Sequence, residues 1–217
     1  MKINAIITAG GTSSRFGNKN KLLEKINGIE VIKHTVDMFR LPRIDKIIVC
    51  ANVTIIDELQ DIFKGYDNLD IIEGGETRQQ SVYNGLKHEK CDYVLIHDGA
   101  RPLITKELIN TCIESVIDLK AISVMTKTID TIKEVENGII IKTIDRSKLY
   151  NTQTPQAFEY NLIMKAHQKY EGQNFTDDSG LAEAKGAKEY VVNGSYRNIK
   201  ITTQSDMALA QAYFDNN

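Results

Sequence analysis

The residues best suited to chemistry follow the first apolar run of the chain, Ile3 to Ile7. That run breaks into Thr8-Ala9-Gly10-Gly11-Thr12-Ser13-Ser14-Arg15, and two lysines follow, Lys19 and Lys21. Glycines let backbone N–H groups approach phosphate oxygens closely, and the three cations neutralise phosphate charge. The segment is neither a GxGxxG nor a GxxxxGK[ST] motif. Two interpretations therefore stay open: a triphosphate-binding loop, or a strand-to-loop turn with solvated cations.

A second glycine-rich turn, from Glu73 to Ser81, follows another apolar run. Gly74 and Gly75 permit close backbone approach, which suits a base edge read by main-chain groups, and Ser81 adds a hydroxyl. The alternative is a glycine-rich turn that simply ends in a helix cap at Thr77.

A carboxylate follows a third apolar run, in the segment His97-Asp98-Gly99-Ala100-Arg101-Pro102. Asp98 could hold a ribose hydroxyl, a divalent cation or a substrate hydroxyl, with Gly99 clearing space beside it. Arg101 could bind a phosphate through its planar guanidinium, or it could form an internal pair with Asp98. We expect His97 to be a packed strand residue rather than a base.

Two later segments add polar groups. Thr176-Asp177-Asp178 is typical of a helix N-cap with acidic residues in the first turn. Lys200 lies inside the apolar run Ile199–Ile201 and points either to solvent or at an anion. The sequence suggests no Ser/His/Asp set, reactive cysteine, paired-acid site or zinc site. Cations, glycines, hydroxyls and a few carboxylates fit phosphoryl or nucleotidyl transfer, where catalysis is largely positioning and charge stabilisation.

The elements that must position these groups alternate between strand and helix. The predicted strands are Ile3–Ile7, Lys46–Ala51, Leu69–Glu73, Tyr93–His97 and Ala121–Thr126. The predicted helices are Glu30–Arg40, Ile55–Lys64, Arg78–His88 and Lys106–Asp118, the last two capped by Thr77 and Thr105. This order predicts a Rossmann-like, doubly wound, mostly parallel α/β sheet. Ligands bind such sheets at the carboxyl ends of the strands, where the chemical groups above lie.

The pattern changes near Ile129. Thr131–Val135 and Ile139–Ile144 flank Asn137-Gly138, a strong hairpin signal. Because an isolated two-stranded ribbon is marginal, either the parent sheet or another subunit must cover it. Beyond it we expect helices at Tyr160–Tyr170 and Asp178–Gly186, a strand pair at Glu189–Val192 and Ile199–Thr202, and a final helix at Gln204–Phe214. The prediction is one domain over residues 1–217 with a hairpin arm inserted at residues 130–150.

Composition narrows the class of protein. The chain has 217 residues and a net charge of −2, which gives no reason to expect nucleic-acid or membrane binding. No apolar run approaches the length needed to span a bilayer, and the N-terminus lacks a signal-peptide pattern. Cys50, Cys91 and Cys112 are widely spaced and are interpreted as reduced core thiols. We therefore expect a cytoplasmic protein.

Taken together, these segments resemble the 2-C-methyl-D-erythritol 4-phosphate cytidylyltransferase family of the non-mevalonate isoprenoid pathway. The matching motifs, in order along the chain, are Ala9-Gly10-Gly11…Arg15-Phe16-Gly17…Lys21, Gly74-Gly75-Glu76-Thr77-Arg78…Ser81-Val82…Gly85-Leu86, His97–Pro102, Asp130-Thr131-Ile132-Lys133, Asp145-Arg146…Gln153-Thr154-Pro155-Gln156-Ala157-Phe158, Thr176-Asp177-Asp178 and Asn198-Ile199-Lys200-Ile201-Thr202. The chain departs from the family pattern at Ser13, which replaces a glycine, and in a shorter spacing between Arg15 and Lys21.

The resemblance implies a Mg²⁺-dependent enzyme that joins CTP and methylerythritol phosphate into a CDP-alcohol and pyrophosphate. It implies catalytic roles for Arg15, Lys21 and Lys200. The CTP-binding residues that it implies are Ala9, Gly10, Gly11, Gly75, Glu76, Ser81, Asp98 and Gly99. Those for the second substrate are Asp98, Arg101, Thr131, Arg146, Thr154, Thr176 and Lys200. Of these, Thr131, Arg146 and Thr154 would complete the pocket of a neighbouring subunit in a homodimer formed through the hairpin arm. The triphosphate would hold the metal, with no direct protein ligand.

Two rival functions remain. One is a ribitol 5-phosphate cytidylyltransferase of teichoic acid synthesis, a sister family. The segments Asp145–Tyr150 and Thr176–Asp178 favour methylerythritol phosphate over ribitol phosphate. The other is a non-catalytic nucleotide sensor on the same fold, which would not need cations around a leaving group. Pyrophosphate release tested with each alcohol phosphate would separate the three.

Overall fold

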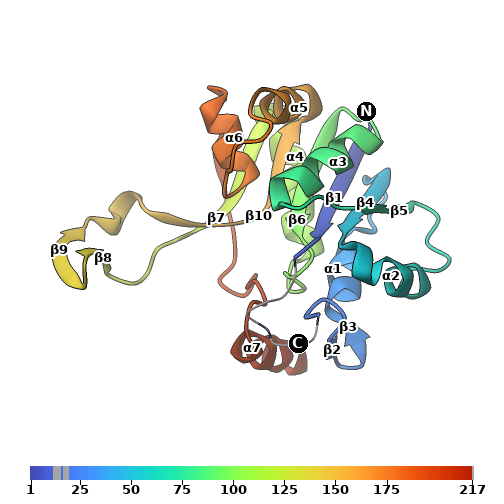
Figure 1. Cartoon of the computed structure of the whole chain (residues 1–217), viewed down its shortest axis with the longest axis horizontal. Coiled ribbons are helices and arrows are strands. Elements are labelled where there is room, and N and C mark those ends of the chain that lie inside the picture. Colours follow the sequence, from blue (N-terminus) through green and yellow to red (C-terminus); the bar gives the residue numbers. More distant parts are fainter. Residues whose placement is uncertain (12–15, 17–19, 217) are drawn as a thin grey trace.

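We describe the chain from a computed structural model, which covers residues 1–11, 16 and 20–216. A central sheet is built from β1 (Ile3–Ala9), β4 (Lys46–Ala51), β5 (Leu69–Glu73), β6 (Tyr93–Asp98), β7 (Ala121–Lys127), β10 (Tyr150–Glu159) and β11 (Tyr190–Asn193). Their order across the sheet is β11-β7-β10-β6-β1-β4-β5 (Figure 1). All neighbouring pairs are parallel except those of β10, which runs antiparallel to both β6 and β7. The predicted fold class is confirmed.

Helices cover both faces of this sheet. They are α1 (Val31–Phe39), α2 (Ile56–Ile62), α3 (Arg78–His88), α4 (Lys106–Leu119), α5 (Tyr160–Lys169), α6 (Asp178–Ala184) and α7 (Gln204–Asp215), with short 3₁₀ turns at Val53–Ile55 and Arg146–Lys148. Strand side chains alternate between two hydrophobic cores: Ala5 and Ile7 pack with α1 and α4, whereas Ile6 packs with α3 and α5. None of the described helices is long and apolar enough to cross a membrane.

The helices that flank the glycine turns begin where the sequence predicts. Thr77 caps α3 in a capping box, in which its hydroxyl accepts from the Gln80 N–H and the Gln80 side chain bonds back to the Thr77 N–H. Thr105 caps α4. In α6 the cap is Asp177 rather than Thr176, and its carboxylate accepts from the Gly180 N–H at 2.9 Å.

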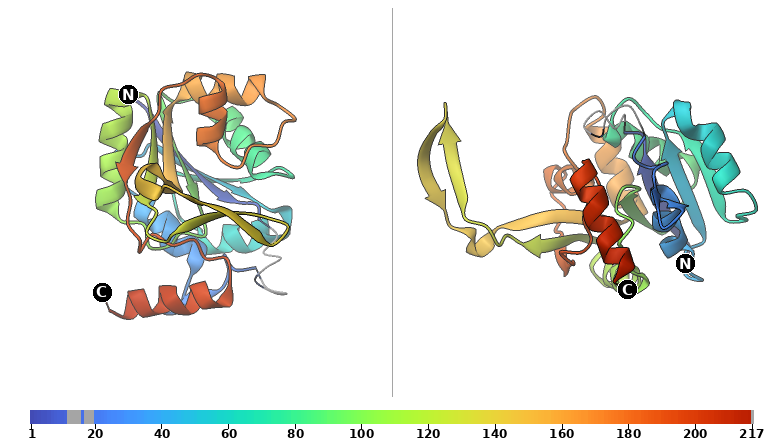
Figure 2. Two further views of the ribbon diagram at one scale, coloured as in Figure 1. Left: turned by 90° about the vertical axis from the view of Figure 1, so that its left-hand side faces the viewer. Right: turned by 90° about the horizontal axis from the view of Figure 1, so that it is seen from below.

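The predicted hairpin is present and stands away from the rest of the molecule (Figures 1 and 2). Its strands, β8 (Ile132–Glu136) and β9 (Ile139–Ile144), form a separate two-stranded sheet. Asn137 and Gly138 have φ angles of 48° and 81°, the left-handed values that an Asn-Gly hairpin turn requires. A second Asn-Gly turn, unpredicted, joins the short strands β2 (Lys25–Ile26) and β3 (Ile29–Glu30).

Strand β10 was not predicted, although it lies in the middle of the sheet. Its polar residues and Pro155 are typical of a loop, because proline cannot donate to a sheet ladder. The structure accommodates Pro155 at a register irregularity between Thr152 and Gln156. Gln156 is fully buried, and both polar atoms of its side chain have hydrogen-bond partners. A polar residue can therefore lie inside this strand, which the sequence pattern did not indicate.

The predicted strand at Ile199–Thr202 is wrong. These residues follow β11 as an irregular segment that is tied to the β6 loop by one backbone hydrogen bond, from the Ile201 N–H to the Ala100 carbonyl at 2.8 Å. The apolar side chains of this segment pack against the core, Ile201 fully buried and Ile199 in part, without joining a sheet ladder. This attachment brings Lys200 beside the end of β6.

Replacing Gln156 by Leu is expected to lower the free energy of unfolding by about 1–3 kcal/mol, because it leaves buried polar groups unpaired. The Gln156 Oε1 accepts from the N–H groups of Asp178 and Ser179 at 3.0 and 3.2 Å, and its Nε2 donates to Asp177 at 2.8 Å. Denaturant unfolding measures the change, with the exposed Gln173→Leu as control. Equal midpoints for the two variants would contradict this account of β10.

Candidate active site

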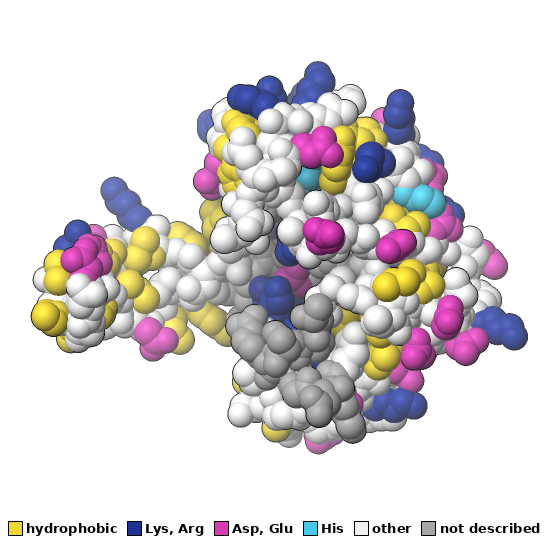
Figure 3. Space-filling model, in the orientation of Figure 1, with side chains coloured by type: hydrophobic (Ala, Val, Ile, Leu, Met, Phe, Trp, Pro, Cys, Tyr) yellow, Lys and Arg dark blue, Asp and Glu magenta, His cyan; other side chains and the backbone are white. Residues whose placement is uncertain are grey.

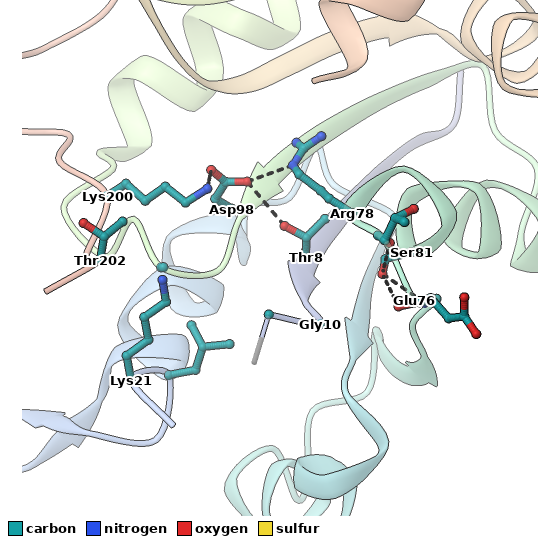
Figure 4. A pocket seen from close by; sticks show the side chains of 14 residues that line it. Thr8, Gly10, Lys21, Glu76, Arg78, Ser81, Asp98, Lys200 and Thr202 are labelled. Atoms are coloured by element: carbon teal, nitrogen blue, oxygen red, sulfur yellow. Dashed lines mark hydrogen bonds and ion pairs between the residues drawn. The ribbon is translucent and has the colours of Figure 1, made fainter. Parts of the chain in front are cut away.

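A cavity of about 370 Å³ opens at the carboxyl ends of β1, β5 and β6 (Figure 4). The described residues that line it are Thr8, Gly10, Gly11, Lys21, Leu22, Gly75, Glu76, Thr77, Arg78, Ser81, Asp98, Ala100, Lys200 and Thr202. They come from five separate parts of the chain, and the parallel sheet brings them to one edge. This is the edge at which doubly wound sheets bind ligands.

The two glycine turns meet at Ser81. Its hydroxyl donates to the Thr77 carbonyl at 2.9 Å and accepts from the Gly75 N–H at 3.0 Å. A Cβ at Gly10 would lie 3.1 Å from the same hydroxyl, and a Cβ at Gly75 would lie 2.2 Å from the Gln80 Cβ. Gly75 therefore needs to be glycine for the β5 loop to pack against the start of α3, whereas a side chain at Gly10 would press on the Ser81 hydroxyl.

Asp98 is buried at the end of β6 and lies among three cations. Its Oδ2 is 2.9 Å from the Lys200 Nζ and 3.5 Å from the Arg101 Nε, while its Oδ1 is 3.2 Å from the Arg78 Nε. Burial disfavours ionisation, but the charges of Arg78, Lys200 and Arg101 outweigh it and hold the pKa of Asp98 well below its ordinary value. The carboxylate is therefore ionised and fixed.

A hydrogen-bond relay behind Asp98 fixes its backbone. The Asp98 N–H donates to the Thr154 hydroxyl at 3.1 Å, which lies 2.9 Å from the His97 Nδ1, and the His97 Nε2 lies 3.3 Å from the Arg101 carbonyl. Each group finds a partner if the Thr154 hydroxyl donates to Nδ1 and Nε2–H donates to the carbonyl. Complete burial lowers the pKa of His97 to about 3, despite the neighbouring Asp98 carboxylate. His97 is a packed, neutral residue, as predicted.

Two residues predicted to face the second substrate lie behind Asp98. Arg101 is 9 % exposed, pairs with Asp98 and donates to the Asn198 carbonyl at 2.8 Å, so the internal pair is present. Thr154 is 4 % exposed and its hydroxyl is engaged within its own chain. Within a single chain β10 thus holds Thr154 inside the sheet, and its place in a neighbour's pocket stays a prediction.

Lys21 and Lys200 both reach the cavity, from opposite ends of the sequence. Figure 4 shows them extending into it from different segments, with Gly10 across from Lys21. Of the two predicted orientations of Lys200, towards solvent or towards an anion, the structure shows the second, because its ammonium pairs with Asp98. Figure 3 shows basic and acidic side chains together in the hollow at the middle of this face.

The other predicted site residues are placed as follows. Those that line the cavity are Gly10, Gly11, Lys21, Gly75, Glu76, Ser81, Asp98 and Lys200. Ala9 and Gly99 are buried next to it, and a Cβ at Gly99 would lie 2.6 Å from the Ile32 side chain. Thr131 and Arg146 are exposed at the base of the hairpin, and Thr176 is exposed ahead of α6. Arg15, Ser13 and Lys19 lie outside the described residues.

The sequence did not single out three polar residues that line the cavity: Thr8, Arg78 and Thr202. Arg78 and Thr202 belong to the matching motifs, but nothing in their spacing indicates a contact with Asp98 or with the cavity. Arg78 forms a second ion pair, in which its Nη1 lies 2.6 Å from Asp178. Thr8 pairs with Asp98 in the sheet register and donates a hydrogen bond to its carboxylate at 3.4 Å.

The three cysteines are free thiols, as predicted. Burial raises the pKa of each of them, Cys50, Cys91 and Cys112, to about 12. Since the thiolate is the nucleophile and the metal ligand, thiols with pKa values this high are poorly suited to either role.

Comparisons with known proteins agree with the resemblance found in the motifs. The model of the 2-C-methyl-D-erythritol 4-phosphate cytidylyltransferase family matches residues 3–216. The chain belongs to this family. A 2-C-methyl-D-erythritol 4-phosphate cytidylyltransferase of Clostridioides difficile (strain 630) is 41% identical over 221 residues, covering 96% of this chain and 92% of that protein. One from Caldanaerobacter subterraneus subsp. tengcongensis is 41% identical, covering 98% of this chain and 99% of that protein.

Solved structures of the family share the fold. The 4-diphosphocytidyl-2C-methyl-D-erythritol synthase of Anaerococcus prevotii DSM 20548 superposes with a TM-score of 0.88 at 36% identity, covering 99% of this chain and 96% of that one. The 2-C-methyl-D-erythritol 4-phosphate cytidylyltransferase of Thermus thermophilus gives 0.81 at 26% identity, covering 98% of both chains. The fold of this chain is therefore shared by these structures over nearly its whole length.

The burial of His97 predicts a pH dependence of stability. Between its ordinary pKa of 6.5 and its folded pKa of about 3, the unfolded chain binds a proton at His97 that the folded chain does not. Stability conferred by the neutral ring is thus fully present above 6.5 and is lost towards pH 3, by at most about 1.4 kcal/mol per pH unit. Unfolding free energies of wild type and His97→Gln measure it: their difference should shrink as the pH falls. A difference that stays constant between pH 7 and pH 4 would contradict the assignment.

Proposed function

We propose that this chain transfers CMP from CTP to 2-C-methyl-D-erythritol 4-phosphate, giving 4-diphosphocytidyl-2-C-methyl-D-erythritol and pyrophosphate. Family membership supports the activity, and one observation of the site carries the proposal. Lys21 and Lys200, 179 positions apart along the chain, line the same cavity together with a fixed carboxylate. The close relatives carry the name of this activity, whereas nothing in the comparisons favours the ribitol phosphate alternative or a nucleotide sensor.

The reaction joins two anions, which explains the need for cations. The phosphate of the alcohol attacks the α-phosphorus of CTP in line, a new P–O bond forms, and the bond to the leaving pyrophosphate breaks. Each close approach of like charges in a partly dehydrated site costs several kcal/mol, about 4 kcal/mol at 4 Å for an effective dielectric constant of 20. Lys21 and Arg15 would hold the triphosphate and the leaving group, and Lys200 would hold the other side of the α-phosphate.

The glycine turns suit the nucleoside part of CTP. Gly75, Glu76 and Ser81 would read the cytosine, and Gly10 and Gly11 would bring backbone N–H groups to the phosphates, with Ala9 behind them. A base read by main-chain groups needs a rigid backbone. The Gly75 N–H is held by Ser81, and the Glu76 N–H donates to the Gln80 side chain at 2.9 Å. Asp98 and Gly99, at the end of β6, would take the ribose.

The second substrate would lie on the other side of the α-phosphate, against Asp98, Lys200 and Thr176. Arg101 supports Asp98 from behind, and Thr154 does the same through its hydroxyl. Thr131 and Arg146 would complete the pocket of a partner subunit, since both are exposed at the base of the projecting hairpin.

Magnesium would be carried by the triphosphate. No group of three or more histidine, cysteine or acidic side chains that could hold a metal occurs among the described residues. The buried carboxylate Asp98 is already paired with cations. Such a cavity fits an ion that arrives on phosphate oxygens, as Mg²⁺ commonly does, and the ion would neutralise charge on the reacting phosphates. Ala9, Gly10 and Gly11 would bind that complex through the backbone.

A homodimer formed through the hairpin arm completes the proposal. Apolar side chains are exposed along the arm, at 52% for Val135, 67% for Ile139, 62% for Ile140 and 50% for Ile141 (Figure 3). A projecting two-stranded ribbon of this kind is marginal in water unless another surface covers it. A cytoplasmic location stays a prediction from the sequence.

Lys21→Ala is expected to lower turnover by about 100-fold or more, the scale of losing one electrostatic stabiliser of a transition state. Pyrophosphate release from CTP measures it, with methylerythritol phosphate and then ribitol phosphate as acceptor. The exposed Lys185→Ala serves as a charge-matched control. Near-wild-type turnover in purified Lys21→Ala, or release with ribitol phosphate alone, would overturn the assignment.

Ile140→Lys is expected to shift the protein from dimer to monomer, because it places a charge in the apolar surface of the arm. Sedimentation velocity measures the change, and Val53→Lys is the matched control, since Val53 is 63% exposed but lies far from the arm in the 3₁₀ turn before α2. A wild-type protein that sediments as a monomer at micromolar concentration would refute the dimer.

A further inference from the structure

A chain of ion pairs runs from the cavity into the core. Lys200 pairs with Asp98, Asp98 pairs with Arg78, and Arg78 pairs with Asp178, whose carboxylate is also hydrogen-bonded to the His167 Nε2 at 3.1 Å. The far end is fully internal, since the side chains of Asp178 and His167 are each 1% exposed. The near end is open, since the Lys200 side chain is 39% exposed and lines the cavity.

Arg78 approaches Asp98 from the side opposite Lys200, with its Nη groups turned away from the cavity (Figure 4). Its Nε donates a hydrogen bond to Asp98 and its Nη1 donates one to Asp178, so one guanidinium bridges two buried carboxylates. The rigid, planar guanidinium fixes both carboxylates in one geometry, whereas a lysine ammonium is a point charge on a flexible stem. Arg78 therefore holds Asp98 in place from a position that also lines the cavity.

Asp178 in turn fixes Arg78. It lies at the first position of α6, and its N–H donates to the fully buried Gln156 of β10. Burial disfavours its ionisation, but Arg78 and the hydrogen bond from His167 keep the pKa of Asp178 below its ordinary value. The ionised Asp178 carboxylate is held by β10 and α5, and its ion pair with Arg78 therefore fixes the position of the guanidinium.

This arrangement affects Lys200, whose ammonium can pair either with Asp98 or with a phosphate of a bound substrate. In the structure its ammonium is 2.9 Å from Asp98, and a phosphate in the cavity competes for the same ammonium. When Lys200 turns to a phosphate, Asp98 loses one cation, and an uncompensated buried charge is costly. The remaining pairs with Arg78 and Arg101 compensate that loss.

We propose that Arg78, locked by Asp178, is a positioning residue that keeps Asp98 in place and so releases Lys200 to the substrate phosphate. The inference rests on the proposed function and adds to it a role for two residues whose side chains act through Asp98. Without Arg78, Asp98 would hold Lys200 more tightly, and both CTP binding and turnover would suffer.

The test is a double-mutant cycle on kcat/KM for CTP, with Arg78→Met, Asp178→Asn and the double variant. Asp178→Asn keeps the shape and an acceptor for His167 but removes the charge that locks Arg78. We expect each single variant to lower kcat/KM by about tenfold or more, and the double variant to be no worse than Arg78→Met, because Asp178 acts through Arg78. Calorimetric affinity for CTP should fall in parallel. Glu183→Gln, an exposed charge loss on the same helix, should match wild type.

Additive losses in the double variant, or a wild-type kcat/KM in either single variant, would overturn the inference. Thermal unfolding is measured for every variant, so that a loss of fold is not mistaken for a loss of function. If Asp178→Asn does not fold, Arg78→Lys takes its place: it keeps the positive charge but loses the rigid guanidinium that fixes both carboxylates, so wild-type kcat/KM in this variant would overturn the inference. A wild-type protein that releases no pyrophosphate with either alcohol phosphate would instead overturn the proposed function, and this inference with it.

Discussion

The site depends on one buried negative charge, that of Asp98. An isolated carboxylate in a protein interior carries a desolvation cost of several kcal/mol, which only well-placed cations and hydrogen bonds offset. Here three cations lie within 3.5 Å of its oxygens, and a backbone hydrogen bond to Thr154 fixes its position. Each cation comes from a different segment of the chain: Arg78 from α3, Arg101 from the β6 loop, and Lys200 from the segment before α7. Compensating this charge therefore ties three segments to the end of β6.

The sheet topology places the start of the hairpin arm and the cavity at the same edge of the sheet. Strands β6 and β7 both run antiparallel to β10, so their carboxyl ends lie at one edge of the sheet. The chain leaves β7 at that edge, forms the hairpin, and returns as β10 by pairing Tyr150 with Lys127. The arm thus departs from the edge at which the cavity opens.

Much of the fold could be predicted from the sequence because local rules and tertiary structure agree there. The strands Lys46–Ala51 and Leu69–Glu73 and the helix Arg78–His88 have the predicted bounds, since apolar runs, glycine turns and the Thr77 cap point the same way. Strand β10 could not be predicted, because its polar residues are satisfied by Asp177, Ser123 and the start of α6, partners far away in sequence. The strand expected at Ile199–Thr202 fails for the opposite reason: apolar alternation without a neighbouring strand.

The site was predicted in part for the same reason. Residues that follow a strand directly, such as Gly10, Gly75 and Asp98, are placed by the parallel sheet and are found at the cavity. The partners of Asp98 are set by long-range packing, so the roles of Arg78 and Thr154 emerge only in the structure. Arg101 shows the limit: the sequence allows a phosphate ligand or an internal pair with Asp98, and only the structure shows the pair.

The most direct test of this account is the ionisation of Asp98 in the folded protein. The ¹³Cγ resonance of Asp98, assigned by its absence in Asp98→Asn, can be followed as the pH falls from neutral. Three neighbouring cations predict that the resonance keeps the chemical shift of a carboxylate down to the lowest pH at which the protein remains folded. A resonance that titrates at or above the ordinary aspartate pKa of 3.8 would contradict the central claim, because the cations would then not be stabilising the charge.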